Sequence, residues 1–514
     1  MNINEAKEEI KRTIEIYLDK NEFGGYTIPV EKQRPVFMTG APGIGKTAIM
    51  QQIAEELGIA LVSYSMTHHT RQSALGLPVI ETKEFNGKQF IVSEYTMSEI
   101  VASVYNVMEQ SGKREGILFL DEINCVSETL APAMLLFLQY KIFGNQQIPE
   151  GWVVVTAGNP PEYNKSVKEF DVATLDRLKC IKVEEDFGVW KQYAYRQGIH
   201  AAVISFLEIN KQWFYSVQAD VDGVQYVTAR GWEDLSSAIK LYEKKDFDVS
   251  GSLIRQYITN TEVARKFTAY YKLHKKYQSS YQIKDILIGN IPVDVLQKSM
   301  EAKLDERFSV LGLFLDELNT GFRTATDRES ILQMVVKSLR IVKKEIKQEK
   351  ENTRKLPASS YINEEKQKIK QEMESQMAAN SLSERGRAIY LSSMQILSGY
   401  EGLLAGEDAD KDFLKVKKAF TKETKQHEKY IDKVKAQLEN AFAFIEKAWG
   451  NSQEIVLFVT ELTAGHDSIA FINQWGSDSY FRYNKELLIY SQHEKLSMEI
   501  EAETAGGLYE NKIL

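Results

Sequence analysis

Cysteine is almost absent from this chain of 514 residues, which contains only Cys125 and Cys180. The two residues do not form a Cys-x-x-Cys pair, so the sequence offers neither a disulfide framework nor a zinc ribbon. So few thiols fit a reducing compartment. Because hydrophobic residues make up 43% of the chain, it can instead bury a large apolar core.

Long hydrophobic runs are also missing. No stretch reaches the roughly 18 uninterrupted apolar residues of a membrane helix. The N-terminal segment MNINEAKEEIKRTIEIYL has the pattern of a charged amphipathic helix and lacks the apolar core and cleavage site of a signal peptide. We therefore expect a cytoplasmic protein without membrane insertion.

The chain has no excess of basic charge. Its net charge is -8 at pH 7 and its pI is about 5.7. Nucleic acids are held largely by clusters of Lys and Arg that contact phosphate. The composition therefore argues against nucleic acid as a partner held by overall charge, although a local basic lining remains open.

Short apolar runs alternate with helical patterns in the first part of the chain. Five of these runs read as strands: 35–39, 60–65, 116–120, 152–157 and 180–183. They are mostly continuous rather than alternating, as expected for strands buried on both faces of a parallel sheet. They predict an α/β domain over residues 1–186. Asn86-Gly87 lies between two alternating segments and predicts a type I′ hairpin inserted at about 78–95.

The remainder of the chain has mainly helical patterns. We expect a helical lid over 187–245, and a helical C-terminal region over 246–514 with an extended arm at about 328–450. Two seams with apolar spacing of three and four, Leu332–Ile346 and Ile431–Ala448, predict either a coiled-coil-like hairpin or two ordinary bundle helices. The charged segment 350–412 between them predicts flexible joints, because Pro357, Gly399, Gly402 and Gly406 interrupt it.

A glycine-rich loop follows the first predicted strand and precedes a helical pattern. The expected nucleotide-binding residues are Gly40, Ala41, Pro42, Gly43, Ile44, Gly45, Lys46, Thr47 and Ala48. Glycines at this spacing let backbone N–H groups and the following helix N-terminus surround a polyphosphate. Lys46 would contact the β and γ phosphates, and Thr47 would offer its hydroxyl to Mg²⁺. The motif therefore predicts binding of ATP with Mg²⁺.

Two carboxylates end the third predicted strand, GILFLDEIN. Asp121 would serve the metal through a water, and Glu122 would be the base that polarises the attacking water. Taken alone, the pair could also cap the next helix. Asn159 ends the fourth predicted strand at the same sheet edge. It could bond the γ-phosphate or the attacking water, or could be a turn residue before Pro160.

The phosphate loop, LFLDEIN, TAGNP and FDVATLDRL together resemble the AAA+ superfamily and, within it, the MoxR-like ATPases. The resemblance covers roughly residues 20–245. It implies an AAA+ α/β domain with a five-stranded parallel sheet and a helical lid, in a homo-oligomeric ring that is usually a hexamer. It also implies chaperone-like work on a protein client, together with a separate protein that carries a von Willebrand A domain.

The same resemblance assigns two arginines. Arg177 would be the finger that completes the site of the neighbouring subunit, where a guanidinium supplied in trans stabilises charge on the γ-phosphoryl oxygens. The alternative is a solvated pair with Asp176. Arg230 would be the sensor arginine of the lid, although it could instead stack on Trp232 or pair with Glu233. Cys125 and Leu178 depart from residues common in MoxR-like chains.

These features predict a ring ATPase that hydrolyses ATP to ADP and phosphate in order to remodel or activate a protein client. Two alternatives remain open. One is a nucleic-acid-linked motor or defence ATPase, against which the acidic composition weighs. The other is a scaffold that nucleotide locks in place, with the heptad-spaced helices as its functional part.

Overall fold

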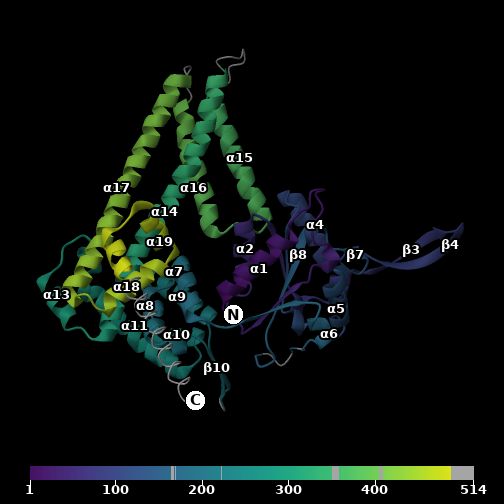
Figure 1. Cartoon of the computed structure of the whole chain (residues 1–514), viewed down its shortest axis with the longest axis horizontal. Helices are drawn as coiled ribbons and strands as arrows, with labels where there is room; N and C mark the ends of the chain where they lie inside the picture. Colours follow the sequence, from purple (N-terminus) through teal and green to yellow (C-terminus); the bar gives the residue numbers. More distant parts are fainter. Residues whose placement is uncertain (164–166, 168, 221–222, 350–357, 405–408, 488–514) are drawn as a thin grey trace, which may run out of the picture. The chain divides into compact units, whose positions relative to one another are not determined.

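The computed structural model describes the whole chain except residues 164–166, 168, 221–222, 350–357, 405–408 and 488–514 (Figure 1). The chain divides into two compact units. The first contains Met1–Val189, Thr228–Arg230 and Ile331–Lys417. The second contains Trp190–Val227, Gly231–Ser330 and the chain from Lys418 onwards. Each unit is therefore assembled from separated segments of the sequence.

A five-stranded sheet forms the centre of the first unit. Its strands are β1 (Val36–Gly40), β2 (Ala60–Ser65), β5 (Gly116–Asp121), β8 (Trp152–Gly158) and β9 (Lys179–Val183). Their order is β2-β5-β8-β1-β9, and all neighbours pair in parallel. Every residue of the central strand β8 is buried. The predicted α/β fold with a parallel five-stranded sheet is confirmed, and each strand lies within one residue of its expected limits.

Helices precede and connect these strands. They are α1 (Ile3–Tyr17), α2 (Ala48–Leu57), α3 (Arg71–Leu75), α4 (Glu99–Ser111), α5 (Ala131–Tyr140) and α6 (Val172–Leu175). Single turns of 3₁₀ helix occur at Val30–Lys32, Met66–His68, Ile123–Cys125, Lys211–Trp213 and Gly402–Leu404. Helix α2 ends at Gly58, whose φ of 66° is the left-handed conformation that glycine adopts readily. Helix α4 begins after Ser98, whose side chain accepts a bond from the backbone N–H of Ile100.

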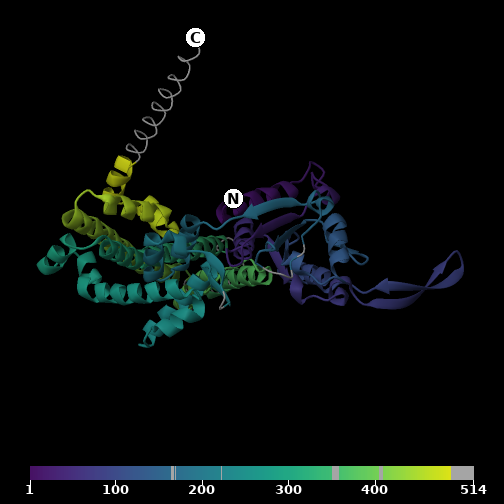
Figure 2. The ribbon, with the colours of Figure 1, turned by 90° about the horizontal axis from the view of Figure 1, so that it is seen from below.

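The predicted hairpin is present between β2 and β5. Strand β3 (Pro78–Phe85) pairs antiparallel with β4 (Lys88–Tyr95), and it projects from the rest of the α/β fold (Figure 2). Asn86 and Gly87 have φ values of 52° and 76°, as the type I′ turn requires. A second, shorter hairpin joins β6 (Ile142–Phe143) to β7 (Gln146–Gln147).

Helices dominate the second unit. Helix α7 (Phe187–Gln197) leads into it, and it also contains α8 (Ala201–Ile209), α9 (Ala229–Lys244), α10 (Gly251–Tyr257), α11 (Thr261–Tyr281), α12 (Ile283–Leu287), α13 (Val293–Met300), α18 (Gln453–Ala464) and α19 (His466–Trp475). The segment expected to be a helical lid, 187–245, is not helical throughout. Strand β10 (Ser216–Asp220) pairs antiparallel with β11 (Gly223–Val227) there. Their apolar residues alternate over only five positions each, which is too short to stand out from the helical pattern around them.

Two long helices pass from one unit to the other. They are α14 (Leu304–Glu349) and α17 (Ala409–Trp449). Between them in the sequence lie α15 (Ala358–Ala378) and α16 (Glu384–Glu401). The expected interruption at Gly399 is wrong, because α16 continues through it to Glu401. Pro357 and Gly406 lie outside the described residues, and Gly402 starts a 3₁₀ turn.

The two apolar seams fall in different parts of these helices. Residues of the second seam, from Ile431 to Ala448, share one core with the first half of α14 and with α18 and α19. This part of α17 is therefore a bundle helix, which was one of the two expectations. In the first seam, Leu332, Val335, Leu339, Val342 and Ile346 are buried within the first unit.

Within the described ranges, no single helix is both long and apolar enough to cross a bilayer. Helices α18 and α19 reach that length only together, and the chain bends by 90° between them.

Candidate nucleotide site

The loop from Gly40 to Thr47 joins the carboxyl end of β1 to the first turn of α2. Gly43 and Gly45 have φ values of 76° and 98°, which a side chain would strain. A Cβ on Gly40 would lie 2.5 Å from the carbonyl oxygen of Val183 on β9. Each glycine of the motif therefore has a steric reason to be glycine. Gly43 and Gly45 adopt a backbone conformation that favours glycine, and Gly40 lies too close to β9 for a side chain.

Lys46 lies within this loop and is only 7% exposed. Its Nζ donates to the carbonyl oxygens of Gly40 at 2.7 Å and Ala41 at 2.9 Å, and to Oδ1 of Asn159 at 2.9 Å. Burial lowers the pKa of Lys46 to about 8, while the charge of Asp121 opposes the shift. These three acceptors are all neutral. A phosphate anion bound in the loop would interact with the charged amine more strongly than they do.

This pKa predicts that affinity for ATP falls as pH rises above about 8. Below that pH the amine is already charged. Above that pH, Lys46 in the free protein loses its proton, whereas bound phosphates favour the protonated amine. Affinity for ATP should therefore fall by up to about tenfold per pH unit. Isothermal titration of ATP between about pH 7 and pH 9.5 measures the slope. Lys46→Arg keeps its charge and should give a flat profile; a flat profile for the unmodified protein would contradict the prediction.

Thr47 and Asp121 form a pair of oxygen donors at the edge of the sheet. Oγ1 of Thr47 donates to Oδ2 of Asp121 at 2.6 Å, and Oδ1 of Asp121 accepts from the backbone N–H of Glu122 at 2.9 Å. Oxygen donors suit Mg²⁺, which keeps several waters as further ligands. Within the described residues, no group of three or more His, Cys, Asp or Glu could hold a metal. Water and phosphate oxygens would therefore complete the coordination.

Glu122 follows directly after β5, and its φ of 56° places it in the left-handed region. Its Oε2 accepts hydrogen bonds from the hydroxyls of Ser65 at 2.8 Å and Thr67 at 3.0 Å. The pairing of β2 with β5 sets Ser65 opposite Asp121 and so brings these hydroxyls to Glu122. Sequence reasoning missed Ser65 and Thr67. The available signal was their position at the end of a predicted strand, at the edge that Asp121 and Asn159 also occupy.

Asn159 comes immediately after β8, where the sequence placed it. Its side-chain Oδ1 accepts a hydrogen bond from Lys46, and its backbone oxygen accepts one of 2.8 Å from Nδ2 of Asn124. A Cβ on Gly158 would lie 2.4 Å from Oδ1 of Asn124, so the small residue before Asn159 makes this contact possible. The structure thus brings Lys46, Thr47, Asp121, Glu122 and Asn159 together in one cluster.

Arg230, the second residue of α9, belongs to the same unit as this cluster. Its Cβ would lie 3.5 Å from a Cβ built on Gly43, and its charge contributes to the lowered pKa of Lys46. Arg230 therefore lies beside the phosphate loop and is exposed. This position suits contact with a phosphate bound in that loop.

Arg177 is not part of the cluster. It precedes β9, and the pairing of β1 with β9 sets Val36 opposite Lys179 and Gly40 opposite Val183. Arg177 therefore lies beyond the opposite end of the strands from the phosphate loop, about 13 Å or more along the sheet. The side chain is exposed, and Nη1 donates to the carbonyl of Ala173 at 2.8 Å.

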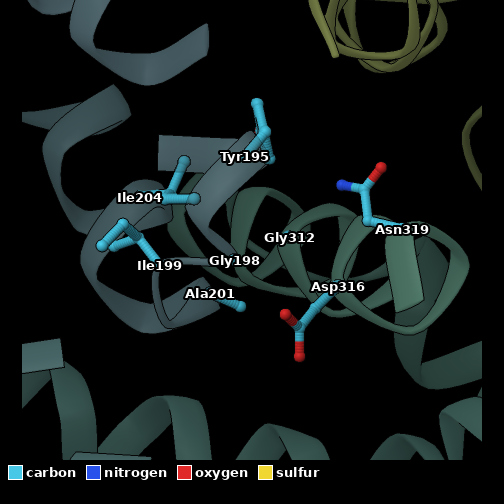
Figure 3. Close-up of a pocket in the computed structure, with 8 residues that line it drawn as sticks. All are labelled: Tyr195, Gly198, Ile199, Ala201, Ile204, Gly312, Asp316 and Asn319. Atoms are coloured by element: carbon cyan, nitrogen blue, oxygen red, sulfur yellow. The ribbon is translucent and has the colours of Figure 1, made fainter. Parts of the chain in front are cut away.

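A separate pocket lies wholly in the second unit (Figure 3). It has about 310 Å³ of empty space, part of it open to solvent, and α7, α8 and α14 contribute its lining. Its apolar lining includes Tyr195, Ile199, Ala201 and Ile204, and Asp316 and Asn319 supply polar side chains. It contains none of the residues expected to bind nucleotide.

Residues 36–165 match a known protein family, described as ATPase family associated with various cellular activities (AAA). A comparison with curated proteins finds no match. The matched segment runs from the first residue of β1 to just beyond Asn159, and so contains the phosphate loop, the acidic pair and the asparagine. Together with the parallel sheet, the match identifies an AAA ATPase domain in this chain, a type of domain that binds and hydrolyses ATP.

Proposed function

We propose that the chain is a MoxR-like ATPase that works in an oligomeric ring and uses hydrolysis to remodel or activate a protein client. The observation that carries the proposal is the cluster of two hydrogen-bonded pairs, Lys46 with Asn159 and Thr47 with Asp121, with Glu122 bonded through its backbone N–H to Asp121. Bound ATP would supply the phosphoryl group, and Mg²⁺ would neutralise the charge of the phosphates. The residues present fit that ligand.

The proposed roles follow from the contacts within the cluster. Lys46 binds phosphate oxygens, and Thr47 and Asp121 hold the metal with its waters. Glu122 accepts the proton of the attacking water once its carboxylate is released from Ser65 and Thr67. Asn159, held by Lys46 and Asn124, orients either that water or the γ-phosphate. Arg230 contacts phosphate from the same chain.

A ring is supported by the position of Arg177. Its side chain is exposed at the end of the strands opposite the phosphate loop, so it cannot reach its own site. AAA domains typically form oligomeric rings, in which a second copy can bring Arg177 to the first copy's phosphate. Hexamers and a separate von Willebrand A partner are proposed from the resemblance to MoxR-like chains.

The experiment is to purify Glu122→Gln from its native host in ATP, measure its size and identify the proteins that accompany it by mass spectrometry. We expect an ATP-dependent ring together with a von Willebrand A protein. Lys46→Ala, which loses the phosphate-binding amine, is the matched control and should stay unassembled. A monomer in ATP, or a complex with nucleic acid, would contradict the proposal.

A further inference from the structure

The turn between α15 and α16, Ala379–Ser383, docks on the open edge of the sheet and is called the arm turn below. Strand β2 is an edge strand, so one side of its backbone has no neighbouring strand. The N–H of Leu61 donates to the carbonyl of Ala379 at 2.8 Å, and Nδ2 of Asn380 donates to the carbonyl of Leu61 at 3.1 Å. The arm turn thus pairs both polar backbone groups of Leu61.

The docking is well packed. Ala379 is fully buried in the core of the α/β domain, among residues of β2 and α4 that include Ala60, Val62 and Ile100. Asn380 has a φ of 51°, and after a helix asparagine is the commonest residue besides glycine in this conformation. Its backbone N–H donates to the carbonyl of Met377 at 3.0 Å, and its side chain reaches the carbonyl of Leu61.

The arm turn also contacts the helix that follows the phosphate loop. Oγ of Ser383 donates to Oε1 of Glu55 on α2 at 2.7 Å. Nζ of Lys113 donates both to Oγ of Ser381 at 3.2 Å and to the carbonyl of Gly58 at 2.7 Å, and so links the arm turn to the connection between α2 and β2. The arm turn is therefore bonded to α2 and β2, the elements that follow the phosphate loop in the chain.

Strand β2 connects this contact to the candidate base. Leu61 and Ser65 lie four residues apart on it, about 13 Å. Ser65 and Thr67 both donate to the same oxygen of Glu122. These two bonds tie the carboxylate to the end of β2 and to the turn that follows it. While β2 keeps this position, Glu122 is held by hydroxyl groups rather than left free to polarise a water.

We propose that the arm turn acts as a brake on hydrolysis, with Asn380 as a positioning residue that holds β2 and, through Ser65 and Thr67, the carboxylate of Glu122. The proposal rests on the proposed ATPase function and deepens it. Anything that binds the helices of the arm and loosens the arm turn would release Glu122 and raise turnover. A binding event on the arm would in this way control the rate of ATP hydrolysis.

The test is Asn380→Asp, which keeps the size of the side chain and its tolerance of a positive φ but removes the donor and sets a carboxylate against the carbonyl of Leu61. The kcat for ATP hydrolysis should rise about three- to tenfold, the range that loss of one net hydrogen bond produces, with KM unchanged. In a Ser65→Ala/Thr67→Ala background the same substitution should have no further effect. Asn363→Asp, at an exposed position on α15, is the matched control and should match the unmodified protein.

Asn380→Gly provides a second variant if Asn380→Asp folds poorly. It keeps the backbone conformation, loses only the side-chain bond, and should give a smaller rise in kcat. Unchanged kcat in both variants, or an equal rise with and without Ser65 and Thr67, overturns the brake. If the unmodified protein hydrolyses no more ATP than Lys46→Ala, the proposed function itself fails. The two failures are therefore distinguishable.

Discussion

Replacing Glu122 with glutamine should lower kcat for ATP hydrolysis by about 10²- to 10⁴-fold, the usual contribution of a positioned general base. Glutamine has nearly the same shape and can still meet the hydroxyls of Ser65 and Thr67, but it cannot accept a proton from water. None of the three hydrogen bonds that Lys46 donates involves the substituted group. Affinity for ATP should therefore change by less than about threefold.

Steady-state phosphate release and isothermal titration with ATP measure the two quantities separately. Asp121→Asn is an informative companion, because Asp121 is bonded to Thr47 and faces the proposed metal. It should make turnover depend on higher Mg²⁺ concentration, whereas Glu122→Gln should not respond to added metal. Normal turnover in Glu122→Gln would remove Glu122 from the catalytic role and leave its contacts with Ser65 and Thr67 as structural.

Arg177→Ala should lower kcat by about 10³- to 10⁵-fold, the effect of an arginine finger supplied by a neighbouring molecule. The side chain is exposed, and it donates to the carbonyl of Ala173, only four residues earlier in the chain. Folding and the melting temperature should therefore change little. ATP affinity should also be kept, because Arg177 lies at the far end of the strands from the phosphate loop.

Mixing two inactive variants distinguishes action between subunits from action within one. A ring that contains both Arg177→Ala and Glu122→Gln chains includes some sites with an intact Glu122 from one chain and an intact Arg177 from the next. Partial recovery of turnover on mixing is the expected result. No recovery, when co-assembly is demonstrated by size, would show that Arg177 does not complete a neighbour's site. Arg177→Lys should recover little, because an ammonium lacks the planar fork of the guanidinium.

Much of the α/β domain could be predicted from the sequence because its strands are buried on both faces. Such strands appear as uninterrupted apolar runs, and their polar ends mark the sheet edge where a ligand binds. Asp121, Glu122 and Asn159 were named in this way, and Lys46 and Thr47 were named from the glycine-rich loop. The β10–β11 hairpin was missed because strands of five residues contain too few alternations to separate them from the helices around them.

The contacts of Ser65, Thr67 and Asn380 could not be predicted for a different reason. Serine and threonine after a strand are common in turns, and only the register of β2 against β5 brings these two to Glu122. Asn380 meets Leu61 across 319 residues of sequence. Its identity suggests a helix end, and nothing in a single sequence indicates which backbone it contacts.

The arm turn also has a consequence for how the chain reaches its folded state. The edge of β2 and part of the α/β core are completed by Ala379, which the ribosome adds long after the five strands have been made. Domains generally fold as units, beginning with the N-terminal one during synthesis, and contacts between distant residues form slowly. During synthesis, the backbone edge of β2 in the α/β domain therefore stays unpaired until residues 379–383 have been made. The arm turn is thus a late-folding element of this domain.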